Sequence, residues 1–119
     1  MSEMTLLSRG HPSRRPLVWL HGEVRSPPFS VAARREAGFL LRRLQRGESI
    51  GLPHARPMPS IAARCVELRI VDVNTTWRLI VRPDPDLILI LAVFAKKTQR
   101  TPAPVLDACR RRLQAFDAC

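Results

Sequence analysis

The apolar run LILILAVF, at residues 87–94, constrains the fold more than any other feature, because none of its side chains is polar. A strand with one face in water alternates apolar and polar residues, whereas a strand covered on both faces is apolar throughout. No apolar run in the chain approaches the roughly 18 residues that a membrane-spanning helix needs. We therefore expect a strand covered on both faces and no contact with a membrane.

Two segments before this run have the alternation of strands. Residues 65–71, CVELRIV, place apolar side chains on one face and charged ones on the other, and residues 77–82, WRLIVR, do nearly the same. DVNT at 72–75 and PDPD at 83–86 have the composition of turns. Three strands joined by short turns predict an antiparallel meander.

Two segments have the periodicity of amphipathic helices. In residues 29–47 apolar side chains recur every three or four positions, with Ser30 as the expected N-cap and Gly47 just past the end. Residues 101–117 show a similar apolar stripe and begin at Thr101, another expected N-cap. These segments predict two helices that pack their apolar faces on the sheet.

The remaining segments complete a one-domain plan. Residues 1–15 form a polar leader that is a candidate for disorder, residues 17–20 a short strand, and residues 48–61 a proline-rich loop. A chain of 119 residues has the length of one domain, which we place at residues 16–119. The predicted fold class is α+β, with an antiparallel meander sheet packed against helices.

The charge of the chain indicates which classes of partner it can attract. Twenty Lys and Arg residues against ten Asp and Glu give a formal net charge of +10. Such a surplus attracts polyanions, of which nucleic acid is the commonest in a cytoplasm, although it also serves solubility alone. The three cysteines form no C-x-x-C pair, which argues against a disulfide framework and a zinc site and indicates a cytoplasmic protein.

The alternation of the first two meander strands predicts a positive surface. It places Glu67, Arg69, Arg78 and Arg82 on the face opposite the apolar side chains. Arg69 and Arg78, on strands about 5 Å apart, would repel each other unless an anion such as phosphate bridged them. The alternative is an ordinary surface cluster in which Glu67 pairs with the arginines.

Lys96 and Lys97, the only lysines, follow the apolar run and would close a third side of this surface, with the 48–61 loop as its rim. The histidines and carboxylates lack the spacing of metal ligands, and no phosphate-binding glycine loop is present, so we expect neither a metal nor a cofactor. Cleavage of RNA by its own 2′-hydroxyl needs only cations and proton transfer, and these residues are compatible with it.

Several segments occur in a distinctive order, namely PLVWLHGEV, ARREAGFLLRRLQRGE, MPSI, ELRI, WRLIV and VFAKKTQRTP. In this order and spacing they resemble the phage-derived HigB/RelE-like toxins of bacterial type II toxin–antitoxin systems, in the RelE/ParE superfamily. The resemblance covers Pro16 to Asp117. It implies a RelE/ParE-like domain and ribosome-dependent cleavage of mRNA, which inhibits translation. It also implies a cognate antitoxin, often a helix-turn-helix protein.

The resemblance also implies roles for individual residues. Arg69 and Arg78 would contact the scissile phosphate, Lys96 and Lys97 would bind the RNA backbone and one of them assist proton transfer, and Glu67 is a candidate base. Further candidates for RNA contact are Arg56, Arg82 and Arg100.

Two departures from the resemblance keep alternatives open. The chain has no tyrosine, and Ala92 stands where relatives often carry His or Glu. One alternative is therefore a member that binds RNA or antitoxin without catalysis. The other is a ParE-like toxin that inhibits gyrase.

Overall fold

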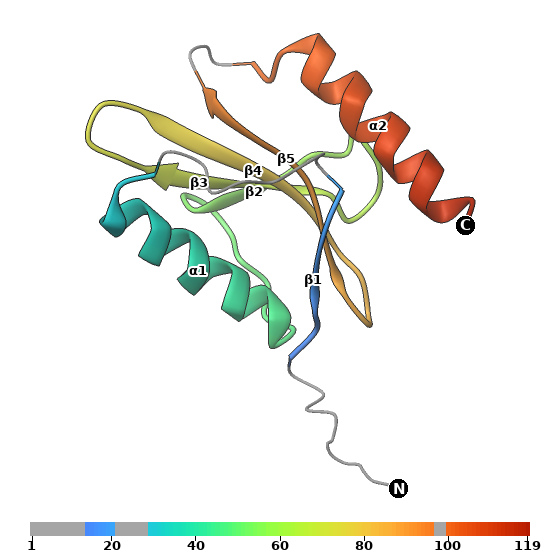
Figure 1. Cartoon of the computed structure of the whole chain (residues 1–119), viewed down its shortest axis with the longest axis horizontal. Helices are drawn as coiled ribbons and strands as arrows, with labels where there is room; N and C mark the ends of the chain where they lie inside the picture. Colours follow the sequence, from blue (N-terminus) through green and yellow to red (C-terminus); the bar gives the residue numbers. More distant parts are fainter. Residues whose placement is uncertain (1–13, 21–28, 97–99) are drawn as a thin grey trace, which may run out of the picture.

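The computed structural model describes residues 14–20, 29–96 and 100–119 (Figure 1). Two helices lie in this part of the chain, α1 (Val31–Gln45) and α2 (Ala103–Asp117). The strands are β1 (Leu17–Trp19), β2 (Ala55–Pro57), β3 (Val66–Val71), β4 (Thr76–Pro83) and β5 (Ile88–Lys96). They form one sheet in the order β1-β5-β4-β3-β2.

The centre of the sheet is the meander. β3, β4 and β5 pair antiparallel, as the alternation and the turns predict, while β1 pairs parallel to β5 at one edge. The α+β prediction is confirmed. The prediction of an uninterrupted loop at 48–61 is wrong, because residues 55–57 form β2 and pair antiparallel with β3 at the other edge.

The sheet lies between the two helices, with a core on each face (Figure 1). Between α1 and the sheet pack Ala33, Ala37, Leu40, Leu41, Leu44, Leu68, Ile70, Leu79, Val81, Ile88 and Ile90. Between α2, the loop after β2 and the other face pack Met58, Ile61, Cys65, Ile80, Leu89, Leu91, Ala92, Cys109 and Leu113. β5 contributes to both cores, which explains why its residues 88–94 are all apolar.

The second core corrects one expectation. The charged face of the meander is not open along its whole length, because α2 and the loop after β2 cover part of it. The alternation shows which side chains share a face of a strand, but it does not predict which elements pack against that face. No helix in the described ranges is long and apolar enough to cross a membrane.

The ends of α1 follow the prediction and the start of α2 does not. The Ser30 hydroxyl accepts a hydrogen bond from the Ala33 N–H at 3.0 Å, and Gly47 follows the helix with a φ of +84°. The N-cap of α2 is Pro102 rather than Thr101. The Thr101 hydroxyl, one residue earlier, donates a hydrogen bond to the Glu67 carboxylate at 2.9 Å.

Asp72, in the turn between β3 and β4, joins α1 to the sheet. Its carboxylate accepts hydrogen bonds from the Ser30 N–H at 3.1 Å, the Trp77 indole N–H at 3.1 Å and the Val73 N–H at 2.8 Å. The predicted leader lies mostly outside the described residues. Arg15, at its end, donates a main-chain hydrogen bond to the end of α1.

Candidate functional site

A buried carboxylate lies at the centre of the site. The Glu67 side chain is 0% exposed, and its Oε1 lies 3.1 Å from Arg56 Nε, 3.6 Å from Lys96 Nζ and 3.8 Å from Arg78 Nη1. Its Oε2 accepts the hydrogen bond from Thr101. We call these five residues the Glu67 cluster; they come from β2, β3, β4, β5 and the segment before α2.

The register of the sheet assembles most of the cluster. Arg56 in β2 lies directly opposite Glu67 in β3, and Arg69 lies directly opposite Arg78 in β4. Cross-strand partners project to the same face of a sheet. The structure therefore places Arg69 and Arg78 side by side on one face, as the alternation predicts, with Arg69 the exposed member of the pair.

A β-bulge brings Lys96 to the same face. Ile80 and Val81 are adjacent in β4, yet they pair with Ala92 and Ile90, so Leu91 is an extra residue in β5. A bulge of this kind shifts the alternation of the strand by one position. Without this shift, Lys96 would lie on the α1 side of the sheet together with Ile90.

The cluster holds more positive than negative charge. Three cations surround one carboxylate, and their side chains are exposed to different degrees: 43% for Arg56, 12% for Arg78 and 5% for Lys96. Burial lowers the pKa of the Arg78 guanidinium, and the charges of Arg69 and Arg56 lower it further, while Glu67 acts in the opposite direction. Burial likewise lowers the pKa of the Lys96 ammonium.

Arg78 has unused hydrogen-bonding capacity. Its Nε is buried and finds no hydrogen-bond partner within the described part of the chain. Buried donors are nearly always paired, because an unpaired one costs about 1–3 kcal/mol. An arginine with a spare donor, next to the exposed Arg69, is suited to an anion with several oxygens, such as a phosphate.

Glu67 is poorly placed for the predicted role of general base. Its carboxylate has no contact with solvent, and both of its oxygens accept hydrogen bonds. A base must come within hydrogen-bond reach of the proton that it removes. In this geometry Glu67 orients the cations around it. The sequence predicts Thr101, its partner, only as a helix N-cap, because no signal in a single sequence joins positions 34 residues apart.

Arg82 lies on the same face but outside the cluster. Its guanidinium donates to both carboxylate oxygens of Asp84 and to both of Asp117 in α2. Hydrogen bonding to Asp117, and then to Asp84, raises the pKa of Arg82. The predicted contact with RNA is not supported by this geometry, because the guanidinium already joins β4 to the end of α2.

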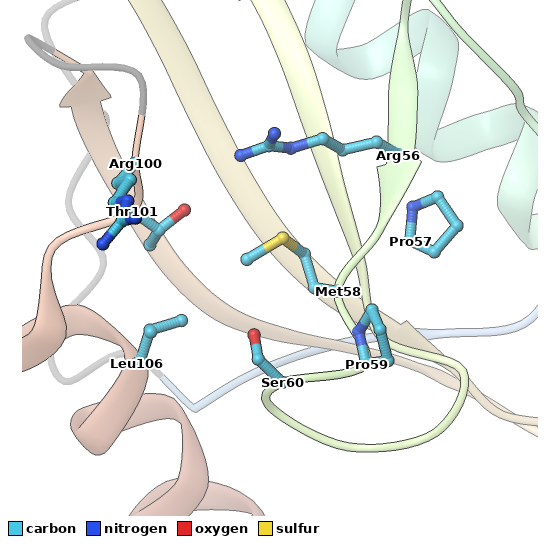
Figure 2. Close-up of a pocket in the computed structure, with 8 residues that line it drawn as sticks. All are labelled: Arg56, Pro57, Met58, Pro59, Ser60, Arg100, Thr101 and Leu106. Carbon is cyan, nitrogen blue, oxygen red and sulfur yellow. The ribbon is translucent and has the colours of Figure 1, made fainter.

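The other predicted residues lie around a hollow beside the cluster (Figure 2). The hollow has a volume of about 330 Å³ and is lined by Arg56, Pro57, Met58, Pro59, Ser60, Arg100, Thr101 and Leu106. Arg56 and Thr101 belong to both the hollow and the Glu67 cluster. Part of the 48–61 segment forms one wall, and the exposed Arg100 lies at the rim. Lys97 lies outside the described residues.

The histidine in the described ranges, His54, lies just before β2. His54 is exposed, and its Nδ1 lies 3.8 Å from the Glu36 carboxylate on α1. The described ranges contain no group of three His, Cys, Asp or Glu residues that could hold a metal ion. The Glu67 cluster itself offers positive charge and hydrogen-bond donors.

Residues 28–114 match a protein family described as Phage derived protein Gp49-like (DUF891). The matched range contains α1, the meander and every residue of the Glu67 cluster. Nothing among the curated proteins or the solved structures matches the chain.

Proposed function

We propose, from the premise that the chain belongs to the Gp49-like family of phage-derived proteins, that it is the toxin of a type II toxin–antitoxin system. In this proposal it acts as a HigB/RelE-like mRNA interferase in the cytoplasm and cleaves mRNA on the ribosome without a metal. A cognate antitoxin, of the helix-turn-helix class, holds it in check.

The surplus of positive charge around Glu67 is the observation that supports this function. In the proposed reaction the 2′-oxygen of the RNA bonds to phosphorus and passes its proton to water, while the bond to the 5′-oxygen breaks and that oxygen gains a proton. Negative charge builds on the phosphate oxygens between these events, and preorganised cations stabilise it. Arg69 and Arg78 take this role in the proposal.

Proton donation is assigned to Lys96 in this proposal. A general acid works best when its pKa lies near the pH of the medium. Burial moves the pKa of Lys96 down in that direction, although the attraction of Glu67 opposes the shift. Lys97, its neighbour in the sequence, is the proposed contact to the RNA backbone.

The proposal is tested by inducing the protein in cells and measuring growth and mRNA cleavage. Wild-type protein without antitoxin should arrest growth and cut translated mRNA. Arg69→Ala and Arg78→Ala should each lower the cleavage rate by about 100-fold, since each removes one stabilising group from the transition state. Arg35→Ala, at an exposed position of α1, should stay fully toxic. Full toxicity of both site variants, purified and shown to be folded, would remove the proposed site.

A second candidate is a member of the same family that binds RNA without cleaving it. It is favoured by the burial of Glu67 and by the absence of tyrosine from the sequence. This candidate predicts that the folded wild-type protein binds single-stranded RNA but neither arrests growth nor shortens mRNA. The induction experiment therefore separates the two candidates.

A further inference from the structure

The hollow beside the Glu67 cluster has an apolar floor that the proposed phosphate chemistry does not use. Met58 is buried in this floor, and Leu106 of α2 is half-buried next to it. Pro57, at the end of β2, and Pro59, in the loop that follows, add apolar surface (Figure 2). Together they form a surface on which a flat ring can lie.

Polar groups surround this floor on the side of the cluster. Figure 2 shows the Arg56 guanidinium extending across the hollow towards Thr101 and Arg100. Arg56 also contacts Glu67, so the hollow and the cluster share one cation. Proteins that bind single-stranded nucleic acid combine cations along the backbone with stacking or apolar surfaces for the bases. Both features occur here within one continuous surface.

The wall formed by the loop is held in place from α2. Arg110 donates two hydrogen bonds to the main-chain oxygen of Ser60, from Nη2 at 2.6 Å and from Nε at 3.0 Å. The loop is thereby fixed to the helix that forms the opposite wall. A preformed site avoids the cost of ordering the loop when the ligand binds.

We propose that this hollow holds one nucleobase of a single-stranded RNA whose neighbouring phosphate lies at Arg69 and Arg78. The proposal rests on the proposed function and adds a binding site for a base to it. The volume of about 330 Å³ lies at the lower end of the range of roughly 300–1,000 Å³ found for small-molecule sites. A hollow of that size suits one nucleotide and excludes a duplex.

Binding of short RNAs to the full chain tests the proposal. The probes are a fluorescent five-nucleotide RNA, 2′-O-methylated so that it cannot be cleaved, and five versions that each lack the base at one position. All of them carry the same phosphates. One abasic version should bind about tenfold more weakly than the complete RNA, because it loses one stacked base. The other four should bind nearly as well as the complete RNA.

A variant whose side chain fills the hollow should show the same loss of affinity for RNA. Ser60→Leu adds a larger aliphatic side chain at an exposed lining position, while the main-chain oxygen bound by Arg110 is kept. It should weaken the binding of the complete RNA about tenfold. It should also remove the difference in affinity between that RNA and the sensitive abasic version. Asn74→Leu, at an exposed position in the turn between β3 and β4, should bind like the wild type.

The outcomes separate this inference from the proposed function. If all six RNAs bind equally to the wild type and Arg69→Ala weakens them all, the chain binds phosphates but the hollow holds no base. If no RNA binds at low salt, the inference is wrong, and growth arrest with mRNA cleavage on induction decides the proposed function separately. If Ser60→Leu is folded and binds every probe as the wild type does, the base lies elsewhere and the inference is wrong.

Discussion

Glu67 and Glu48 show how burial changes the role of the same side chain. Each carboxylate contacts two or more cations: Glu48 lies 3.0 Å from Arg43 Nε and from Arg46 Nη2. Glu48 is exposed, so water can replace its partners. Glu67 has no access to water, and its removal would leave Lys96 and Arg78 near one another with no counter-charge. An uncompensated buried charge is among the most costly defects in a folded protein.

This contrast gives a prediction for stability. Glu67→Gln should lower the free energy of unfolding by roughly 3–5 kcal/mol, because it removes the charge while nearly preserving the shape of the side chain. Glu48→Gln is the matched control and should have a much smaller effect. Chemical denaturation monitored by circular dichroism measures both. Equal losses for the two variants would show that the burial of Glu67 has no energetic consequence.

At the scale of elements, single polar side chains join the helices to the sheet. Asp117 near the end of α2 binds Arg82 of β4, and Asp72 in the β3–β4 turn binds the start of α1. Hydrogen bonds from Ser30, by its side chain and its N–H, and from the Val73 N–H lower the pKa of Asp72 from 3.8 to about 2. The charged form of Asp72 therefore stabilises the docking of α1.

The depressed pKa of Asp72 predicts an acid sensitivity. Its contribution to stability is fully present above the unfolded pKa, near pH 4, and disappears as the pH falls through about 2. The melting temperature of the wild type should therefore fall between pH 4 and pH 2. The Asp72→Asn variant should melt at a lower temperature than the wild type at pH 7, and its melting temperature should fall less between pH 4 and pH 2. The Asp86→Asn variant, changed at an exposed position in the β4–β5 turn, should follow the wild type. Parallel curves for all three proteins would contradict this role of Asp72.

The elements differ in how far the sequence predicts them. The meander and both helices follow from periodicity, because burial of one face or of both imposes a pattern over many residues. β2 has only three residues, one of them proline, so it leaves no pattern; its position depends on pairing with β3. For the site, alternation predicts the pairing of Arg69 with Arg78. It says nothing of the carboxylates that bind Arg82, because one of them, Asp117, lies 35 residues away.

At the scale of the whole molecule, which has a net charge of +10, the carboxylates neutralise some of the arginines and leave others exposed. Several of the described carboxylates are already paired with arginines, as Glu48, Glu67, Asp84 and Asp117 are. Arginines such as Arg69 remain exposed beside the Glu67 cluster. A surface of this kind attracts polyanions over distances on the order of the Debye length, about 8 Å at physiological salt.

Binding of single-stranded RNA should therefore weaken steeply with salt. With four cations on phosphates, the logarithm of the affinity should fall against the logarithm of the salt concentration with a slope of roughly −3. Arg69→Ala should make the slope shallower by about 0.7, and Arg35→Ala should leave it unchanged. Titrations at several concentrations of KCl measure the slope. A flat dependence would show that the positive charge does not serve RNA binding.

The bulge in β5 has a consequence for comparing this chain with its relatives. Leu91 is the spare residue of the strand, so a homologue that lacks it can pair β4 with β5 without interruption and still present its lysine beside the buried glutamate. An alignment of the family should therefore allow a gap at this position, and one drawn without it would match the lysine with residues on the opposite face of the sheet.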